Sequence, residues 1–310
     1  MKQQVVLGVT ALAIGGVVTF AQRPVVPAVA ADPHAGHSMA SQAPAQPQYP
    51  PFARPANERI PPGNEQAAAA LKASTQKNEW VNIQYAGGPA IKSWVAYPAK
   101  PEKAPVVIVI MEIFGLQDWI RGVADQLAED GYIAIAPDLL SGMGPGGGGT
   151  AEIGGPDEAR KVITGLTPEE AANRLKAVRA YALKMPQSNG KTATVGYCWG
   201  GARSFEFAAA EPGLNAAIVF YGTSPSNAPD FAKINAPVLG LYGADDARVN
   251  ATIEPAAAEM KKLGKTFEYE IYQGAGHGFL RAQQDRGGAN YKASEQAWPR
   301  VLGFLEKHTR

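Results

Sequence analysis

At 310 residues, the chain is long enough for one large α/β domain or two small ones, and 45% hydrophobic with 18% charged residues is typical of a globular protein with a substantial core. The formal net charge of +1 excludes a strongly basic nucleic-acid-binding protein and a strongly acidic one. A single cysteine, Cys198, excludes an internal disulfide, so this residue is either incidental or reactive.

The N-terminus has the pattern of an export signal. Lys2 precedes an uncharged, apolar run that continues to Phe20, and an A-x-A sequence occupies residues 28–30. We therefore predict a signal peptide over residues 1–30, cleaved after Ala30, and a secreted product in a bacterial periplasm with no stable membrane insertion. The alternative is an uncleaved anchor, because the apolar run is close to the lower length limit for a membrane helix.

Residues 31–64 are rich in Pro, Ala and Gln, and this composition predicts a disordered linker. His34 and His37 lie close to Met39 there, and such a cluster could bind copper or another soft metal weakly. The alternative is a solvated tail. These histidines precede the predicted folded domain at 65–310, which leaves His277 and His308 as candidate bases.

The first half of the folded domain begins with two alternating runs, at residues 79–85 and 91–97, around a Gly-Gly pair. They predict an antiparallel hairpin. Continuous apolar runs at 105–110 and 132–136 predict strands that are buried on both faces, joined by a helix over 119–129. The glycine-rich stretch that follows, at 141–149, has no periodicity and is predicted to be a mobile loop.

The second half alternates strands with helices. The sequence Thr-Pro-Glu-Glu at 167–170 is a helix start, and its helix is predicted to end near residue 184. Strands are predicted at 193–195, 216–221, 237–242 and 267–272, and helices at 202–208, 255–263 and 294–307. We therefore expect an α/β fold: a mostly parallel central sheet with helices on both faces and an N-terminal antiparallel hairpin.

The sequence GYCWGG at 196–201 stands between a predicted strand and a predicted helix. This context makes the G-x-[SC]-x-G pattern a nucleophile elbow, with Cys198 as the nucleophile. The glycines are needed because a Cβ at either flank would collide with the neighbouring strand or helix. The helix N-terminus favours a thiolate. The alternative is a buried, unreactive cysteine.

A thiol nucleophile needs a base and an acid that orients the base. His277 follows the last predicted strand, and Asp245 and Asp246 follow the strand at 237–242. The order nucleophile, acid, base is that of α/β-hydrolases. Both aspartates remain candidates from the pattern alone.

Four stretches in order, EIFG at 112–115, Gly-Tyr at 131–132 with Pro-Asp-Leu at 137–139, the elbow, and GHGF at 276–279, carry a family resemblance. From about Val106 to Leu305 the chain resembles the dienelactone hydrolase family, cysteine-nucleophile members of the α/β-hydrolase fold. The resemblance implies that Cys198 is the nucleophile and His277 the base. The spacing Gly243-x-x-Asp246 implies that Asp246 is the acid.

The resemblance also implies roles for residues around the thiol. Glu112 matches a glutamate that takes part in activating the thiol when substrate arrives, and Arg281 an arginine that binds a substrate carboxylate. A surface arginine is the alternative for Arg281. The backbone amides of Ile113 and Trp199 are the expected oxyanion hole.

One departure from the family pattern bears on the substrate. The family's second carboxylate-binding arginine is absent after residues 137–139, where LSGM stands at 140–143. We therefore predict a secreted hydrolase of small, less anionic esters or lactones that forms an acyl-enzyme and needs no cofactor and no metal at its site. The alternatives are a non-catalytic periplasmic binding protein on a hydrolase scaffold and an acyltransferase.

Overall fold

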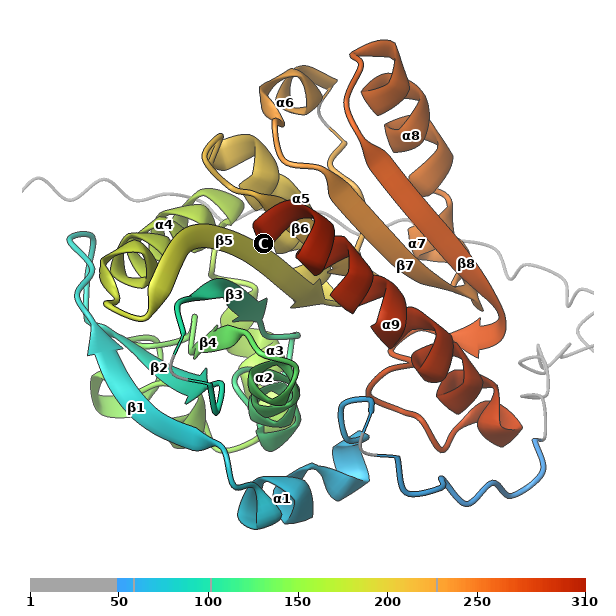
Figure 1. The fold of residues 1–310 in the computed structure, drawn as a ribbon, viewed down its shortest axis with the longest axis horizontal. Coiled ribbons are helices and arrows are strands. Elements are labelled where there is room, and N and C mark those ends of the chain that lie inside the picture. Colours follow the sequence, from blue (N-terminus) through green and yellow to red (C-terminus); the bar gives the residue numbers. More distant parts are fainter. Residues whose placement is uncertain (1–48, 58, 101, 227) are drawn as a thin grey trace, which may run out of the picture. The chain divides into compact units, whose positions relative to one another are not determined.

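The computed structural model describes residues 49–310 except residues 58, 101 and 227 (Figure 1). The predicted signal peptide, the first part of the predicted linker and the cluster of His34 and His37 lie outside the described residues. Within the described part, no helix is both long and apolar enough to cross a bilayer.

An eight-stranded sheet in the order β1-β2-β4-β3-β5-β6-β7-β8 organises the fold. The strands are β1 (Lys77–Ile83), β2 (Ile91–Tyr97), β3 (Ala104–Ile110), β4 (Ile133–Pro137), β5 (Ser188–Tyr197), β6 (Ala216–Phe220), β7 (Val238–Asp245) and β8 (Phe267–Gly276). β1 pairs antiparallel with β2 and β2 antiparallel with β4, while the other pairs are parallel. Every residue of β3, β4 and β6 is buried, as their continuous apolar runs predict.

Helices cover both faces of the sheet (Figure 1). They are α1 (Asn64–Ala73), α2 (Asp118–Glu129), α3 (Pro156–Ile163), α4 (Pro168–Lys184), α5 (Trp199–Ala210), α6 (Ala228–Lys233), α7 (Ala247–Asn250), α8 (Ile253–Lys262) and α9 (Ala289–Thr309). α9 crosses the sheet over β5 to β8, and its Trp298 donates a hydrogen bond to Asp130 at the end of α2, 2.9 Å away. The predicted α/β fold class with an N-terminal antiparallel hairpin is confirmed.

Several elements differ from the prediction. α1, α3, α6 and α7 were not predicted, because each is short and none has a long amphipathic pattern. α9 begins at Ala289, earlier than predicted, and continues through Pro299. α4 begins at Pro168 as predicted, with the hydroxyl of Thr167 accepting a hydrogen bond from the backbone N–H of Glu170, 3.1 Å away.

The glycine-rich loop after β4, which we predicted to be mobile, is anchored by buried polar groups. The Asp138 carboxylate accepts hydrogen bonds from both the backbone N–H and the hydroxyl of Thr150, each 2.7 Å away. The Arg174 guanidinium donates to the carbonyl oxygen of Ser141, 2.8 Å away. Two buried side chains therefore hold this loop by its ends.

Residues 49–63 belong to the predicted linker, and those that the structure describes, all but residue 58, form no helix or strand. They nevertheless pack against the domain. Ile60 is only 3% exposed, and the carbonyl oxygen of Pro62 accepts a hydrogen bond from Trp119 of α2, 3.0 Å away. This described part of the predicted linker is therefore attached to the α/β body.

Candidate active site

The sharp turn between β5 and α5 carries Cys198. Its backbone has φ 55° and ψ −114°, a conformation that is strained for a residue with a Cβ. A Cβ on Gly200 would lie 2.3 Å from the carbonyl oxygen of Met111, and one on Gly201 would lie 2.6 Å from that of Phe220. Neighbouring backbone therefore occupies the space that a side chain would need at either position, and only glycine fits. Cys198 itself is partly exposed.

β7 and β8 bring the candidate acid and base together. Their ends approach so closely that a Cβ on Gly243 would lie 2.6 Å from the carbonyl oxygen of Gly276. His277 directly follows Gly276 and Asp246 lies three residues beyond Gly243, and Asp246 Oδ2 is 2.5 Å from His277 Nδ1. The other carboxylate oxygen of Asp246 accepts a hydrogen bond from the backbone N–H of Val249, 3.5 Å away, at the start of α7.

Asp245, the competing candidate, faces elsewhere. Its side chain is 59% exposed and pairs with the guanidinium of Arg286. Asp246 is buried. The structure thus places Asp246, and not its neighbour, against the imidazole of His277.

The Nδ1 atom of the His277 ring is hydrogen-bonded to the Asp246 carboxylate, and Cys198 is the other side chain that acts on the ring. Burial would lower the pKa of His277, but the interactions with Asp246 and Cys198 outweigh it and raise the pKa to about 9. Because Nδ1 is engaged by Asp246, Nε2 is the ring nitrogen that remains for the thiol. This arrangement can move a proton from sulfur to nitrogen.

The segment after β3 brings an ion pair to the same place. Glu112 is 5% exposed, and its Oε1 lies 2.7 Å from Nε of Arg281. Burial raises the pKa of Glu112 to about 7, although the charges of Arg281 and His277 act in the opposite direction. The Arg281 guanidinium also lies over the Phe114 ring, 4.9 Å from its centroid.

The two amides expected to receive an oxyanion belong to neighbouring segments. Trp199 is the first residue of α5, where a backbone N–H has no intrahelical acceptor. Ile113 lies in the turn in which the Gly115 N–H donates to the Glu112 carbonyl oxygen, 3.1 Å away. The close contact of Gly200 with the end of β3 brings these two segments together.

Tyr221 is a residue of this site that the sequence did not reveal. It follows β6 with φ 39°, and its ring meets the His277 ring edge-on, with centroids 5.2 Å apart. Burial raises its pKa well above 10, and the charge of Glu112 adds to this effect. Its hydroxyl oxygen has no hydrogen-bond partner in the part of the chain that the structure describes. The one available signal was its place at the carboxyl end of a parallel strand.

An aromatic cluster supports the loop that carries His277. Phe279, two residues beyond the histidine, is fully buried. Its ring lies 5.4 Å from those of Tyr221 and Tyr272 and 5.8 Å from that of Phe220. This packing fixes the backbone next to the imidazole.

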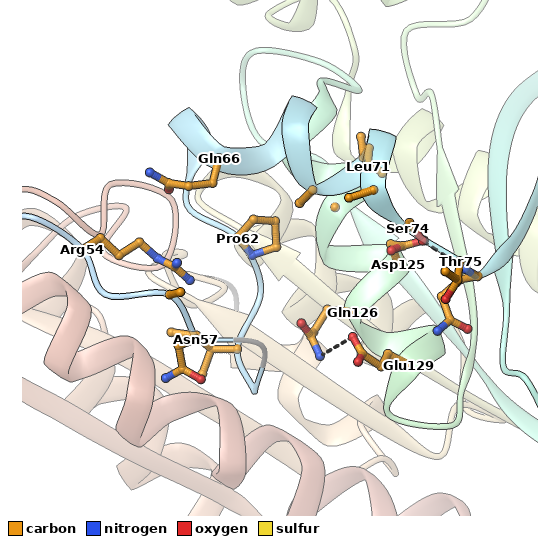
Figure 2. A pocket seen from close by; sticks show the side chains of 16 residues that line it. Arg54, Asn57, Pro62, Gln66, Leu71, Ser74, Thr75, Asp125, Gln126 and Glu129 are labelled. Carbon is orange, nitrogen blue, oxygen red and sulfur yellow. Dashed lines mark hydrogen bonds between the residues drawn. The ribbon is translucent and has the colours of Figure 1, made fainter.

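The site has no metal centre among the described residues, where no group of three or more His, Cys, Asp or Glu could hold an ion. A cavity of about 450 Å³ lies elsewhere, between α1, α2 and the segment before α1 (Figure 2). Among the described residues that line it, none is Cys198, Asp246 or His277.

Comparison with known proteins gives a consistent result. The model of the dienelactone hydrolase family matches residues 91–309. The "Putative carboxymethylenebutenolidase" of Saccharolobus solfataricus is 32% identical over 250 residues, covering 71% of this chain and 95% of that protein. The carboxymethylenebutenolidase of Pseudomonas putida is 31% identical over 233 residues, covering 73% of this chain and 95% of that protein. A crystal structure titled "Putative Dienelactone Hydrolase", from Klebsiella pneumoniae, superposes with a TM-score of 0.67 at 26% identity, covering 75% of this chain and 99% of that one.

Proposed function

The chain belongs to the dienelactone hydrolase family, and from this premise we propose that it cleaves small carboxylic esters or lactones through Cys198, His277 and Asp246. The predicted family, and with it the predicted hydrolase class, is confirmed, in preference to a non-catalytic binding protein. The relatives named carboxymethylenebutenolidase support a lactone as one substrate.

The contact between His277 Nδ1 and Asp246 Oδ2, 2.5 Å, is the observation that carries the proposed mechanism. It holds the imidazole in the orientation and tautomer in which Nε2 can take the Cys198 proton. The sulfur then attacks the substrate carbonyl and forms a tetrahedral intermediate. The backbone amides of Ile113 and Trp199 would donate hydrogen bonds to its oxyanion.

Collapse of the intermediate forms a thioester on Cys198 and expels the alkoxide, which takes the proton held by His277. Water, deprotonated by the same imidazole, would then attack the thioester. The carboxylic acid leaves and the thiol is restored.

Glu112 and Arg281 would make the reaction depend on whether the substrate carries a carboxylate. In the structure each is the other's partner, 2.7 Å apart. A carboxylate on the substrate would compete with Glu112 for the guanidinium, since an arginine pairs well with any carboxylate. Because the Arg281 charge lowers the pKa of Glu112, its loss would raise that pKa further, and the released carboxylate would be a stronger base for a proton beside the thiol.

Substitution of the nucleophile tests the proposal. We expect Cys198→Ala to lose essentially all turnover of short activated esters while melting at the temperature of the wild type. With a slow ester, the intact mass of the wild type should increase by one acyl group, and the mass of the variant should not. Equal turnover by the variant would refute the mechanism, and transfer of the acyl group to an added alcohol would indicate an acyltransferase.

We also propose that the protein is exported. The support is the sequence of residues 1–30, with its basic start, its apolar run and its A-x-A site. Expression of the full chain in a bacterium, followed by intact mass measurement of the periplasmic fraction, tests this. A mature N-terminus at Ala31 is expected, and a cytoplasmic, uncleaved product would contradict the proposal.

A further inference from the structure

Residues 49–63, here called the strap, lie next to the loop of residues 277–288, here called the site loop. The site loop carries His277 and Arg281 at the candidate active site. The strap lies outside the region that the family model matches, which begins at residue 91. A contact between the two would therefore be a feature of this chain and not of the matched domain.

One buried amide joins the strap to the site loop. Gln283 is only 1% exposed, and its Oε1 accepts a hydrogen bond from Nε of Arg54 in the strap. Its Nε2 donates to the carbonyl oxygen of Pro61, 3.0 Å away, and to that of Leu280 within the site loop, 2.9 Å away. Both ends of this side chain are thus satisfied, and two of its three hydrogen bonds join the strap to the site loop.

Two further contacts reach the site loop from the same side. The backbone N–H of Asn64, directly after the strap, donates to the carbonyl oxygen of Arg281, 2.9 Å away. The Arg286 guanidinium donates to the hydroxyl of Tyr49, 3.0 Å away. The backbone of Arg281, whose guanidinium pairs with Glu112, is therefore held from the strap side of the loop.

Hydrophobic packing alone does not explain the course of the strap. Figure 2 shows Arg54, Asn57 and Pro62 on the strap at one side of the cavity that separates it from α1 and α2. Ile60 and Phe52 attach the strap to the hydrophobic core, and polar contacts hold it beside the cavity as well. These polar contacts include the partly buried bond from Arg54 to Gln283 and the buried bond from Gln283 to the Pro61 carbonyl oxygen.

We propose that the strap is a positioning element of the active site, and that Arg54 acts through Gln283 to hold the site loop where Arg281 meets the substrate. The proposal rests on the proposed function, because it assumes that Arg281 binds a substrate carboxylate. Arg54 itself touches no reacting atom. A loop that moves by a fraction of an ångström would misplace the guanidinium and lower turnover of carboxylate-bearing esters most.

The test compares Arg54→Ala with Arg59→Ala, a matched control that removes an exposed arginine from the same strap. Arg54→Lys serves as the conservative variant, because its ammonium can still donate to Gln283. The kcat and KM of the full chain are measured for two esters that differ only by a carboxylate. Hydrogen exchange of the site-loop peptide is measured in parallel.

We expect Arg54→Ala to lower kcat/KM for the carboxylate-bearing ester by roughly tenfold, to change it little for the neutral ester, and to speed exchange in the site loop. Arg59→Ala should match the wild type, and Arg54→Lys should recover part of the loss. Equal losses for both esters, or unchanged kinetics with faster exchange, would overturn the proposal and leave a purely structural strap. If the proposed function itself is wrong, turnover will not depend on Cys198. Comparison of the wild type with Cys198→Ala therefore separates that outcome from failure of the present proposal.

Discussion

Replacing Glu112 with Gln removes a buried negative charge, and we expect the variant to become more stable than the wild type as the pH rises. The side chain is only 6% exposed, and its partner Arg281 lies 2.7 Å away. Even so, burial raises the pKa of the carboxyl to about 7. The desolvation of the charged form therefore outweighs its attraction to Arg281. Glutamine has nearly the same shape and carries no charge at any pH.

The size of the effect follows from that pKa. A rise from the ordinary value of 4.5 to about 7 corresponds to on the order of 3 kcal/mol, at about 1.4 kcal/mol per pKa unit. Because the folded-state pKa is the higher one, this contribution to stability is fully present below pH 4.5 and is lost as the pH rises through 7. The pKa of His277 is also raised on folding, to about 9, so its contribution to stability is likewise lost as the pH rises. This residue titrates in both proteins, and apart from its interaction with the Glu112 charge its contribution cancels from their difference.

Urea denaturation of both proteins at pH 5, 6.5 and 8 measures this difference. The free energy of unfolding of Glu112→Gln, relative to wild type, should rise by roughly 2.5 kcal/mol from pH 5 to pH 8, while its ester hydrolysis falls. Glu158→Gln is the control, because Glu158 is exposed and pairs with Lys161 on the surface of α3. A stability difference that does not change with pH, or one that favours the wild type at pH 8, would refute the reasoning.

Four further substitutions, one of them a control, test the geometry of the site. Asp246→Asn should lower kcat by roughly 10³- to 10⁴-fold, because the imidazole loses its orienting carboxylate, whereas Asp245→Asn should leave kcat within about twofold; esterase assays of the pair decide between them. Gly200→Ala should abolish activity and lower the melting temperature, because its Cβ would lie 2.3 Å from the Met111 carbonyl oxygen; a fully active variant would show that the turn can open. Tyr221→Phe should raise the free energy of unfolding by about 1 kcal/mol, since it removes a buried hydroxyl without a partner among the described residues, and denaturant titration that finds a loss would contradict this.

The sequence predicted the sheet well where burial leaves a clear pattern. Strands buried on both faces, such as β3 and β4, must be continuously apolar, and their runs identified them almost to the residue. The turn at Cys198 could also be predicted, because its glycines are required by close backbone contacts that no other residue permits. Both signals are local, since a few adjacent residues carry the whole constraint.

Other parts of the site depend on contacts between residues that are far apart in the sequence. Asp245 and Asp246 are adjacent, and only the approach of Gly243 to Gly276 decides which of them faces the imidazole. The family resemblance favoured the second aspartate, whereas the pattern alone left the choice open. Tyr221 directly follows the apolar strand β6, and a place at the end of a strand does not by itself separate a hydroxyl at the site from one in the core.

The composition of the strap explains why the sequence did not predict its packing against the domain. Its Pro and Ala residues are typical of linkers, and a segment that forms no helix or strand leaves no periodic pattern. Its attachment depends on Arg54 meeting Gln283, 229 residues away in the chain. Single-sequence reasoning has no access to such a pair.

Cys198 is the sole sulfhydryl of the chain, and its side chain reaches solvent at the elbow. One equivalent of an alkylating reagent would therefore modify one position and no other. The labelled fraction, read by mass spectrometry, would count the competent molecules in any preparation. Rates from different variants could then be normalised to working enzyme and not to total protein.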